Sequence, residues 1–270
     1  MTTTAPHSPR PSAMARARWA VADTMTVTKR NLIRYVRIPE ALFFSTVQPI
    51  MFVLLFRYVF GGAIPVAGGS YVNYLMPGIF VQTVIFGAAS TALGLAEDLQ
   101  SGLLERFRAL PMAHSAVLSG RTLTDLIRNG VVIVVMTAVG LAVGFRPMPD
   151  VLNYLLACVV MMLFAFSLMW IFAIVGLSAP TSETAQLMTF PIIFPLTFAS
   201  TAFVPAASMP GWLQGFAKNQ PVSQAVDAAR SLMVGGPYHN SSSVWISIAW
   251  SIGLLIVFVP LAVRRYRKAT

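Results

Sequence analysis

Charged residues are what this 270-residue sequence lacks most. Only 10% of its residues are Asp, Glu, Lys or Arg and 56% are hydrophobic, whereas roughly 25% are charged in a typical soluble domain. So few charged side chains cannot cover a surface that faces water, which excludes an ordinary soluble globular protein. The composition predicts an all-α integral membrane protein.

Cysteine and histidine are also scarce. The one cysteine, Cys158, lies inside an apolar run and excludes an internal disulfide or a cysteine-rich metal site. His7, His114 and His239 lack the spacing of zinc ligands, and no predicted membrane span contains a histidine base for nucleophilic catalysis. We therefore expect no catalytic residue, no metal site and no bound cofactor in this chain.

Motifs that would supply energy are missing as well. The sequence contains no Gly-Lys pair, so it has no phosphate-binding loop and is not expected to be an ATPase. The central parts of the spans show no clear Asp, Glu or Lys, which disfavours a proton- or sodium-coupled secondary transporter. A channel is the other alternative, but no polar pore stripe or filter-like loop is apparent. A transporter driven by another protein remains the preferred class.

The N-terminal region shows no cleavable signal peptide, because residues 1–40 lack an apolar core of about 7–15 residues. Residues 1–13, rich in Pro, Ser and Thr, predict a disordered tail. Residues 14–37 place apolar side chains on one helical face and most basic ones off it, which predicts an amphipathic helix lying along the membrane. A soluble basic amphipathic segment would show the same pattern.

Six stretches are long and apolar enough to be membrane spans, since a hydrocarbon core about 30 Å thick needs roughly 20 residues of helix. Residues 14–270 are therefore predicted to form a single transmembrane domain. The predicted spans are approximately residues 41–60, 72–96, 122–145, 151–177, 186–204 and 244–263.

The net charge of +10 could suggest a nucleic-acid partner, but the position of the basic residues indicates anionic lipid headgroups instead. If both termini are cytoplasmic, 15 of the 19 Lys and Arg residues fall on the cytoplasmic side of a plasma membrane, as the positive-inside rule requires. We therefore expect a multi-pass protein of the cell membrane with both termini inside.

Residues 97–111 interrupt the apolar pattern between the second and third spans with a short amphipathic helix, too polar to cross the membrane. Gly102 is expected to destabilise that helix slightly, and Pro111 is expected to end it. At the start of the third span, Arg121, Asp125 and Arg128 are spaced for an ion-pair ladder along one helix, with a relay role as the less favoured interpretation. Small residues at Gly87, Thr91 and Gly94, and at Gly140 and Gly144, have the spacing of helix-packing faces.

The fifth span contains Pro191 and Pro195, four residues apart, and predicts a kinked or broken helix. Two further short helices, over residues 210–216 and 223–234, are expected between the fifth and sixth spans. Their apolar faces suit helices that dip into the outer leaflet.

Several runs resemble the type-2 permeases of ABC exporters, particularly those of daunorubicin and doxorubicin resistance. They are GLLERFRALPM (102–112), FPLTFASTAFVP (194–205), MPGWLQ (209–214) and NQPVSQAVDAAR (219–230). The chain departs from the family's frequent N-P-L by reading Asn219-Gln220-Pro221. The resemblance implies that the segment after the second span is a coupling helix, that re-entrant helices follow the fifth span, and that an amphipathic helix precedes the first.

The resemblance also implies a complex of two six-span permeases, identical or paralogous, with two ATPase subunits that bind ATP and Mg. The residues expected to dock on the ATPase are Leu103, Glu105, Arg106, Phe107, Arg108, Leu110 and Pro111.

Aromatic side chains with isolated amides in the first, second and fifth spans suit a lipophilic or amphipathic cargo, so a drug or a lipid is expected. A polysaccharide or glycolipid exporter of the same family is the alternative. The residues expected along the cargo pathway are Phe43, Gln48, Phe52, Gln82, Phe86, Phe194 and Phe198.

Overall fold

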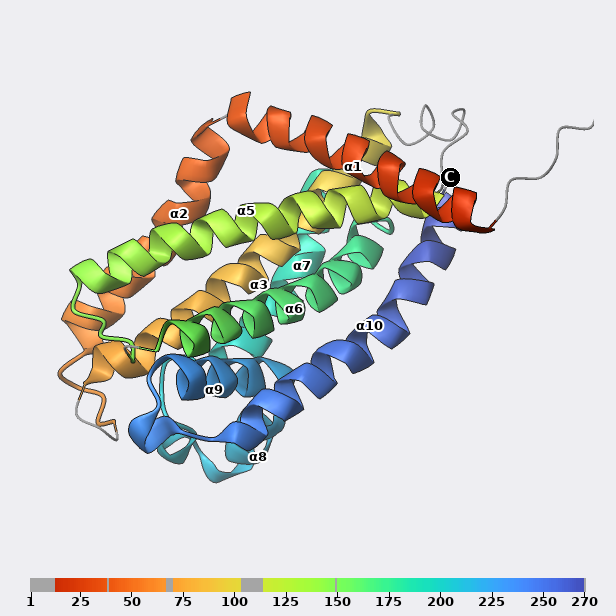
Figure 1. Cartoon of the computed structure of the whole chain (residues 1–270). Helices are drawn as coiled ribbons and strands as arrows, with labels where there is room; N and C mark the ends of the chain where they lie inside the picture. Colours follow the sequence, from red (N-terminus) through yellow and green to blue (C-terminus); the bar gives the residue numbers. More distant parts are fainter. Residues whose placement is uncertain (1–12, 38, 67–69, 103–113, 149, 270) are drawn as a thin grey trace, which may run out of the picture.

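The computed structural model describes residues 13–37, 39–66, 70–102, 114–148 and 150–269, and this part of the chain is helical, without strands (Figure 1). The long helices are α1 (Ala13–Arg37), α2 (Pro39–Leu54), α3 (Tyr71–Gln100), α5 (His114–Ala142), α6 (Val151–Gly176), α7 (Ser182–Phe198) and α10 (Ser241–Ala269). A π-helical turn, η1 (Leu55–Phe60), extends α2, and α8 (Gly211–Asn219) and α9 (Pro221–Met233) follow α7. The 3-10 turns η2 (Ala206–Ser208) and η3 (Gly236–Tyr238) flank these two helices.

Each predicted span coincides with a helix, but only four helices among the described residues are long and apolar enough to cross a membrane. These are α3, the part of α5 from Leu118 to Ala142, α6, and α10 from Ser241 to Arg267. The first predicted span contains a shorter apolar helix, Thr46–Phe60, and the fifth is the 17-residue α7. The all-helical membrane architecture is thus confirmed. By length and composition, the described helices establish four of the six predicted spans.

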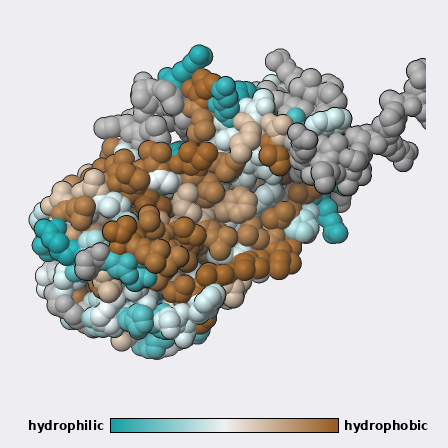
Figure 2. Space-filling model, in the orientation of Figure 1, coloured by the Kyte–Doolittle hydropathy of each residue, from teal (hydrophilic) through white to brown (hydrophobic). Residues whose placement is uncertain are grey.

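Helix α3 lies at the centre of the bundle and is buried along most of its length, packing against α5, α6, α7 and α9. Its contact with α6 is close because Gly176 lies against the backbone of Ala92, where a Cβ atom would overlap the Ala92 carbonyl. Figure 2 shows hydrophobic side chains across the middle of one face of the molecule and hydrophilic ones toward both ends.

Helix α1 buries some of its polar side chains and leaves several apolar ones exposed. Thr28 and Asn31 are buried, and the Thr28 hydroxyl donates to the Gly120 carbonyl of α5 at 3.2 Å. Trp19, Val21 and Met25 are each more than half exposed. In Figure 1, α1 crosses the direction of α3 and α10 at one end of the bundle, an arrangement suited to a helix lying in a membrane interface.

Two sequence-based expectations about helix ends are wrong. The helix α3 continues through Gln100, so residues 97–100 belong to the second span's helix rather than to a separate one. Gly102, predicted inside a helix, has a φ of +65° and ends α3, because glycine adopts this left-handed conformation without a Cβ clash. Asp98, within the segment predicted as an amphipathic helix, belongs to α3 and is buried.

The sequence predicts a kinked or broken helix in the fifth span, and the structure shows no break there. Helix α7 continues through both Pro191 and Pro195 and ends at Phe198, where the N–H of Ala199 donates to the Pro195 carbonyl. Both prolines are exposed on α7. A helix can accommodate proline where other groups satisfy the freed carbonyl.

Helices α8 and α9 confirm the two short helices predicted after the fifth span. Helix α9 is held deep in the bundle by Arg230, which is 3% exposed and lies 3.7 Å above the Tyr74 ring. The Arg230 guanidinium donates to the carbonyls of Tyr74 (3.1 Å) and Thr201 (2.9 Å) and pairs with Asp227 at 2.7 Å. Burial raises the pKa of the Asp227 carboxyl, although Arg230 and the Thr201 hydroxyl act in the opposite direction. One residue thus joins α9, α3 and the turn after α7.

Candidate functional site

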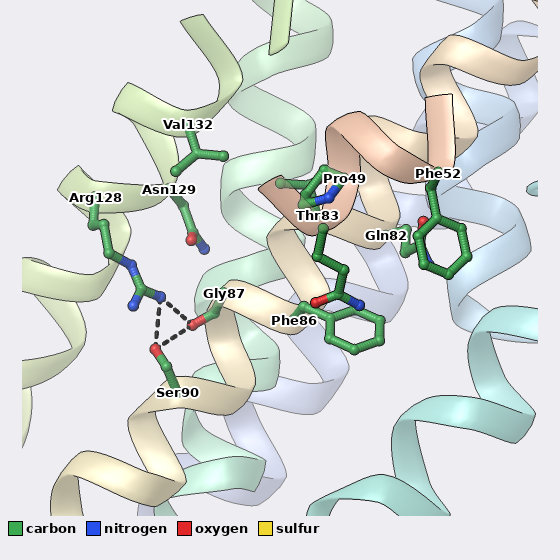
Figure 3. Close-up of a pocket in the computed structure, with 11 residues that line it drawn as sticks. Pro49, Phe52, Gln82, Thr83, Phe86, Gly87, Ser90, Arg128, Asn129 and Val132 are labelled. Carbon is green, nitrogen blue, oxygen red and sulfur yellow. Dashed lines mark hydrogen bonds between the residues drawn. The ribbon is translucent and has the colours of Figure 1, made fainter. Parts of the chain in front are cut away.

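The candidate cargo site is a pocket of about 150 Å³ between α2, α3 and α5, which we call the inner pocket (Figure 3). Four of the residues predicted along the pathway line it: Gln48, Phe52, Gln82 and Phe86. Its remaining lining is Pro49, Thr83, Gly87, Ser90, Arg128, Asn129 and Val132. The pocket therefore combines phenyl rings on one side with amide, hydroxyl and guanidinium groups on the other.

Gln82 has the most unusual environment in the inner pocket. Gln82 is 3% exposed, and neither its Oε1 nor its Nε2 has a hydrogen-bond partner among the described residues. In Figure 3 its amide lies beside the Phe52 ring. A buried amide without partners costs roughly 1–3 kcal/mol by mutational measurements, so a native protein that keeps one invites a functional explanation.

A second cavity adjoins the inner pocket on the side of α7. This groove of about 290 Å³ shares Gln48, Phe86 and Ser90 with the inner pocket and adds Phe190 and Phe194. The Phe86 and Phe194 rings meet edge to face at a centroid distance of 6.3 Å. The structure thus brings five of the seven predicted pathway residues, from the first, second and fifth spans, into two adjoining cavities.

Stacked phenyl rings extend this surface toward the end of the bundle that carries α8 and α9. Phe198, on α7, lies 5.5 Å from Phe194 and 6.3 Å from Phe52 between ring centroids. Phe203, in the turn after α7, continues the stack and lies 4.5 Å from Phe56 of η1 between ring centroids. Local sequence spacing could not predict this contact, because the two residues are far apart in the chain. Phe43 was also predicted here; it lies in α2, but its side chain is outside the described part of the structure.

Beside the inner pocket, α3 and α5 meet along a line of polar side chains that we call the polar seam. Its members on α5 are Arg121, Asp125, Arg128 and Asn129, and those on α3 are Gly87, Ser90, Thr91, Gly94 and Asp98. A Cβ atom at Gly94 would overlap the Arg121 guanidinium, and one at Gly87 would overlap the Asn129 amide. The small residues of α3 therefore make room for polar side chains of α5.

Ion pairs and hydrogen bonds join the two helices along this seam. Arg121 lies 3.5 Å from Asp125 on its own helix and 3.5 Å from Asp98 on α3. The Thr91 hydroxyl donates to Asp125 Oδ2 at 2.8 Å, and Asp125 is fully buried. The predicted Arg121–Asp125 pair is confirmed, but sequence spacing could not show its partners on α3.

Arg128 connects the polar seam to the inner pocket. Its Nη2 donates to the Gly87 carbonyl and to the Ser90 hydroxyl, each at 2.6 Å (Figure 3). Because Gly87, Ser90 and Arg128 also line the pocket, displacement of α5 along α3 would change the pocket's polar wall. At its other end the seam reaches Asp98, close to the end of α3.

Among the described residues, no group of three or more His, Cys, Asp or Glu side chains could hold a metal ion. The residues predicted to dock on an ATPase, 103–111, lie outside the described part of the chain.

Comparison with known proteins identifies this membrane-embedded arrangement. Residues 22–234 match the model of the ABC-2 type transporter family. The chain belongs to the ABC-2 type transporter family. It is 34% identical over 252 residues to the daunorubicin resistance ABC transporter permease protein DrrB1 of Streptomyces coeruleorubidus, covering 92% of this chain and 87% of that protein.

A second ABC-2 relative is the probable doxorubicin resistance ABC transporter permease protein DrrC of Mycobacterium tuberculosis, 31% identical over 263 residues, with 96% of this chain and 94% of that protein covered. The putative transport permease ycf38 of Cyanophora paradoxa is 24% identical over 258 residues, with coverages of 92% and 89%. Membership confirms the predicted resemblance and makes the chain the multi-pass membrane subunit of an ABC transporter, whose ATPase is a separate partner.

Proposed function

We propose that this chain is the permease of an ATP-driven exporter that moves a lipophilic or amphipathic molecule, a drug or a lipid, out of the cytoplasm or inner leaflet. The main support for this class of cargo is the inner pocket, where the Gln82 amide, without a partner among the described residues, lies beside phenyl rings. A cargo with an apolar body and a neutral hydrogen-bonding group would satisfy both. The relatives named for daunorubicin and doxorubicin resistance support the same class.

We further propose six spans with both termini cytoplasmic in the cell membrane. Helix α2 with η1 would be the first span and α7 the fifth, both tilted or locally thinning the bilayer because they are short. The start of α1 and the end of α10 lie at one end of the bundle, and α8 and α9 lie at the other (Figure 1). An even number of spans and the cytoplasmic bias of Lys and Arg both support this topology.

The working complex would contain two permeases and two ATPase subunits. Leu103, Phe107, Leu110 and Pro111 would supply apolar contact with the ATPase, while Glu105, Arg106 and Arg108 would set the register with charges on that partner. ATP and Mg would be bound by the ATPase, which favours one arrangement of the assembled permeases.

The polar seam gives this proposal a physical route from the ATPase to the cargo. A push on the segment after Gly102 would reach α3 at Asp98 and α5 at Arg121, which form an ion pair. Buried ion pairs and hydrogen bonds have discrete geometries, so such a seam would move as a unit or switch partners. Arg128 would then carry the displacement into the inner pocket.

The test is ATP-dependent export by the permease and its ATPase reconstituted in proteoliposomes. We expect a lipophilic anthracycline to stimulate ATP hydrolysis and to accumulate across the membrane, and Gln82→Leu to reduce that accumulation while Trp250→Leu, an exposed position on α10, does not. Stimulation by an oligosaccharide and not by the anthracycline would refute the cargo class. Transport by the permease without ATPase would refute the energy source.

The docking assignment has its own test in the same vesicles. Phe107→Ala and Arg106→Glu should separate cargo movement from ATP hydrolysis, because they remove apolar contact and reverse one charge. Undiminished coupling in both variants would refute the proposed docking segment.

A further inference from the structure

An apolar groove of about 610 Å³ lies between α1 and α5, away from the inner pocket. We call it the α1–α5 groove. Met25, Leu32 and Ile33 form its wall on α1, and Leu123 and Ile127 form its wall on α5. Thr28, Lys29 and Arg37 complete the lining, so almost all the surface inside the groove is hydrocarbon while two cations stand beside it.

Lys29 and Arg37 are exposed, and neither makes a hydrogen bond or ion pair within the part of the chain that the structure describes. They lie eight residues apart on α1, which places them on the same side of the helix about two turns from each other. The other cations described above are paired: Arg121 and Arg230 meet carboxylates, and Arg128 donates to a carbonyl and a hydroxyl. The groove thus carries two positive charges that no described residue compensates.

The floor of the groove continues onto an apolar stripe of α5. Ile127, Val131, Val134 and Val135 recur at the spacing of one helical face, and each is between 38% and 70% exposed. This stripe runs along α5 away from α1 and toward the middle of the predicted membrane span. A hydrocarbon chain lying in the groove would therefore have a continuous apolar path into the bilayer.

We propose that the α1–α5 groove binds one anionic glycerophospholipid, with its phosphate between Lys29 and Arg37 and an acyl chain along Leu123, Ile127 and Val131. Charge complementarity selects this occupant over an apolar segment of a protein partner, which would leave both cations beside hydrocarbon without a counter-ion. Since α1 packs on α5 at Gly120 and α5 carries the polar seam, the lipid would hold the helix whose position sets the inner pocket. The proposal depends on a membrane environment and not on the identity of the cargo.

Native mass spectrometry of the purified full-length chain, titrated with phosphatidylglycerol or phosphatidylcholine, tests this site. We expect one phosphatidylglycerol to bind more tightly than phosphatidylcholine, and Lys29→Gln with Arg37→Gln to weaken that binding about ten-fold or more, as expected for loss of charge-assisted hydrogen bonds. The matched control is Arg264→Gln with Arg265→Gln, which removes two exposed charges from the same end of the molecule and should leave the affinity unchanged.

A second variant separates the groove from a general surface charge effect. Leu123→Trp fills the groove without altering charge and should reduce phosphatidylglycerol binding, whereas glycerophosphoglycerol, the same headgroup without acyl chains, should not compete for the site. Equal loss of lipid in the Lys29/Arg37 and Arg264/Arg265 pairs would overturn the proposal. So would full phosphatidylglycerol occupancy in a folded Leu123→Trp protein.

Discussion

The guanidinium of Arg121 on α5 occupies the space beside Gly94 of α3 that any other residue would fill with its own side chain. Arg121 can reach Asp98 from there only because α3 presents no Cβ atom at this turn. The close approach of two helices and the burial of an ion pair therefore depend on one missing methyl group. This relationship can be tested without removing any charge.

Gly94→Ala should destabilise the protein by about 1–3 kcal/mol, because the added methyl displaces Arg121 from its ion pairs. Gly130→Ala on α5 is the matched control, since the nearest atom to its Cβ would be Met162 Cε at an ordinary 3.7 Å. That control should be neutral or stabilising by up to about 1 kcal/mol through helix propensity. Thermal unfolding in detergent compares the two variants. Equal unfolding midpoints would contradict the close contact between Gly94 and Arg121.

Asp125→Ala should cost about 3–5 kcal/mol, because it leaves Arg121 buried without its neighbouring carboxylate and removes the Thr91 acceptor. The double variant Arg121→Met with Asp125→Leu should be more stable than the single one, since it removes both charges. Asp150→Ala, which deletes an exposed helix cap that accepts from the Leu152 N–H at 3.0 Å, should cost only about 1 kcal/mol. A smaller loss at Asp125 than at Asp150 would show that the seam contributes little.

Gln82→Leu should leave stability unchanged or raise it by about 1–3 kcal/mol, because it removes a buried amide that has no partner, while it lowers cargo transport. Gln220→Leu is the matched control. Its amide donates to the Leu196 carbonyl at 2.8 Å and accepts from the Val222 N–H at 2.9 Å, so its loss should destabilise. If Gln82→Leu destabilised the protein as much as Gln220→Leu, the amide at 82 would have a structural partner.

Arg230→Met should destabilise by about 3 kcal/mol or more, since it leaves the Tyr74 and Thr201 carbonyls and the Asp227 carboxylate without their donor. Asp227→Asn should cost at most about 1.5 kcal/mol, because its oxygen still accepts from Thr201 and burial already raises the pKa of the carboxyl. Thermal unfolding of both variants compares the two losses of stability. A larger loss in Asp227→Asn than in Arg230→Met would show that the carboxylate contributes more to stability than the guanidinium.

Much of the fold could be predicted because apolar length and helical periodicity are local properties of the sequence. All six apolar stretches are helical, and the Arg121–Asp125 pair follows from i, i+4 spacing. Helix ends were harder to predict, since the left-handed Gly102 and the uninterrupted α7 depend on backbone conformation that composition does not fix.

The site required the structure because its members meet across helices. The residue types predicted for the pathway were suitable, and packing brings Gln48, Phe52, Gln82 and Phe86 to one pocket. The partners of the polar seam on α3 and the role of Arg230 depend on contacts between residues 29 to 156 positions apart, which no local pattern encodes.

Helix α3 has 30 residues and is therefore about 45 Å long, with Pro77 near its first turns and Gly102 just past its end. A stiff rod of this length magnifies rotation: swinging it by one degree about one end shifts the other by roughly 0.8 Å. A small displacement at the Gly102 end of α3 would therefore be transmitted to Tyr74 near the other end, where the Arg230 guanidinium lies over the Tyr74 ring. A flexible hinge between these two ends would absorb that displacement.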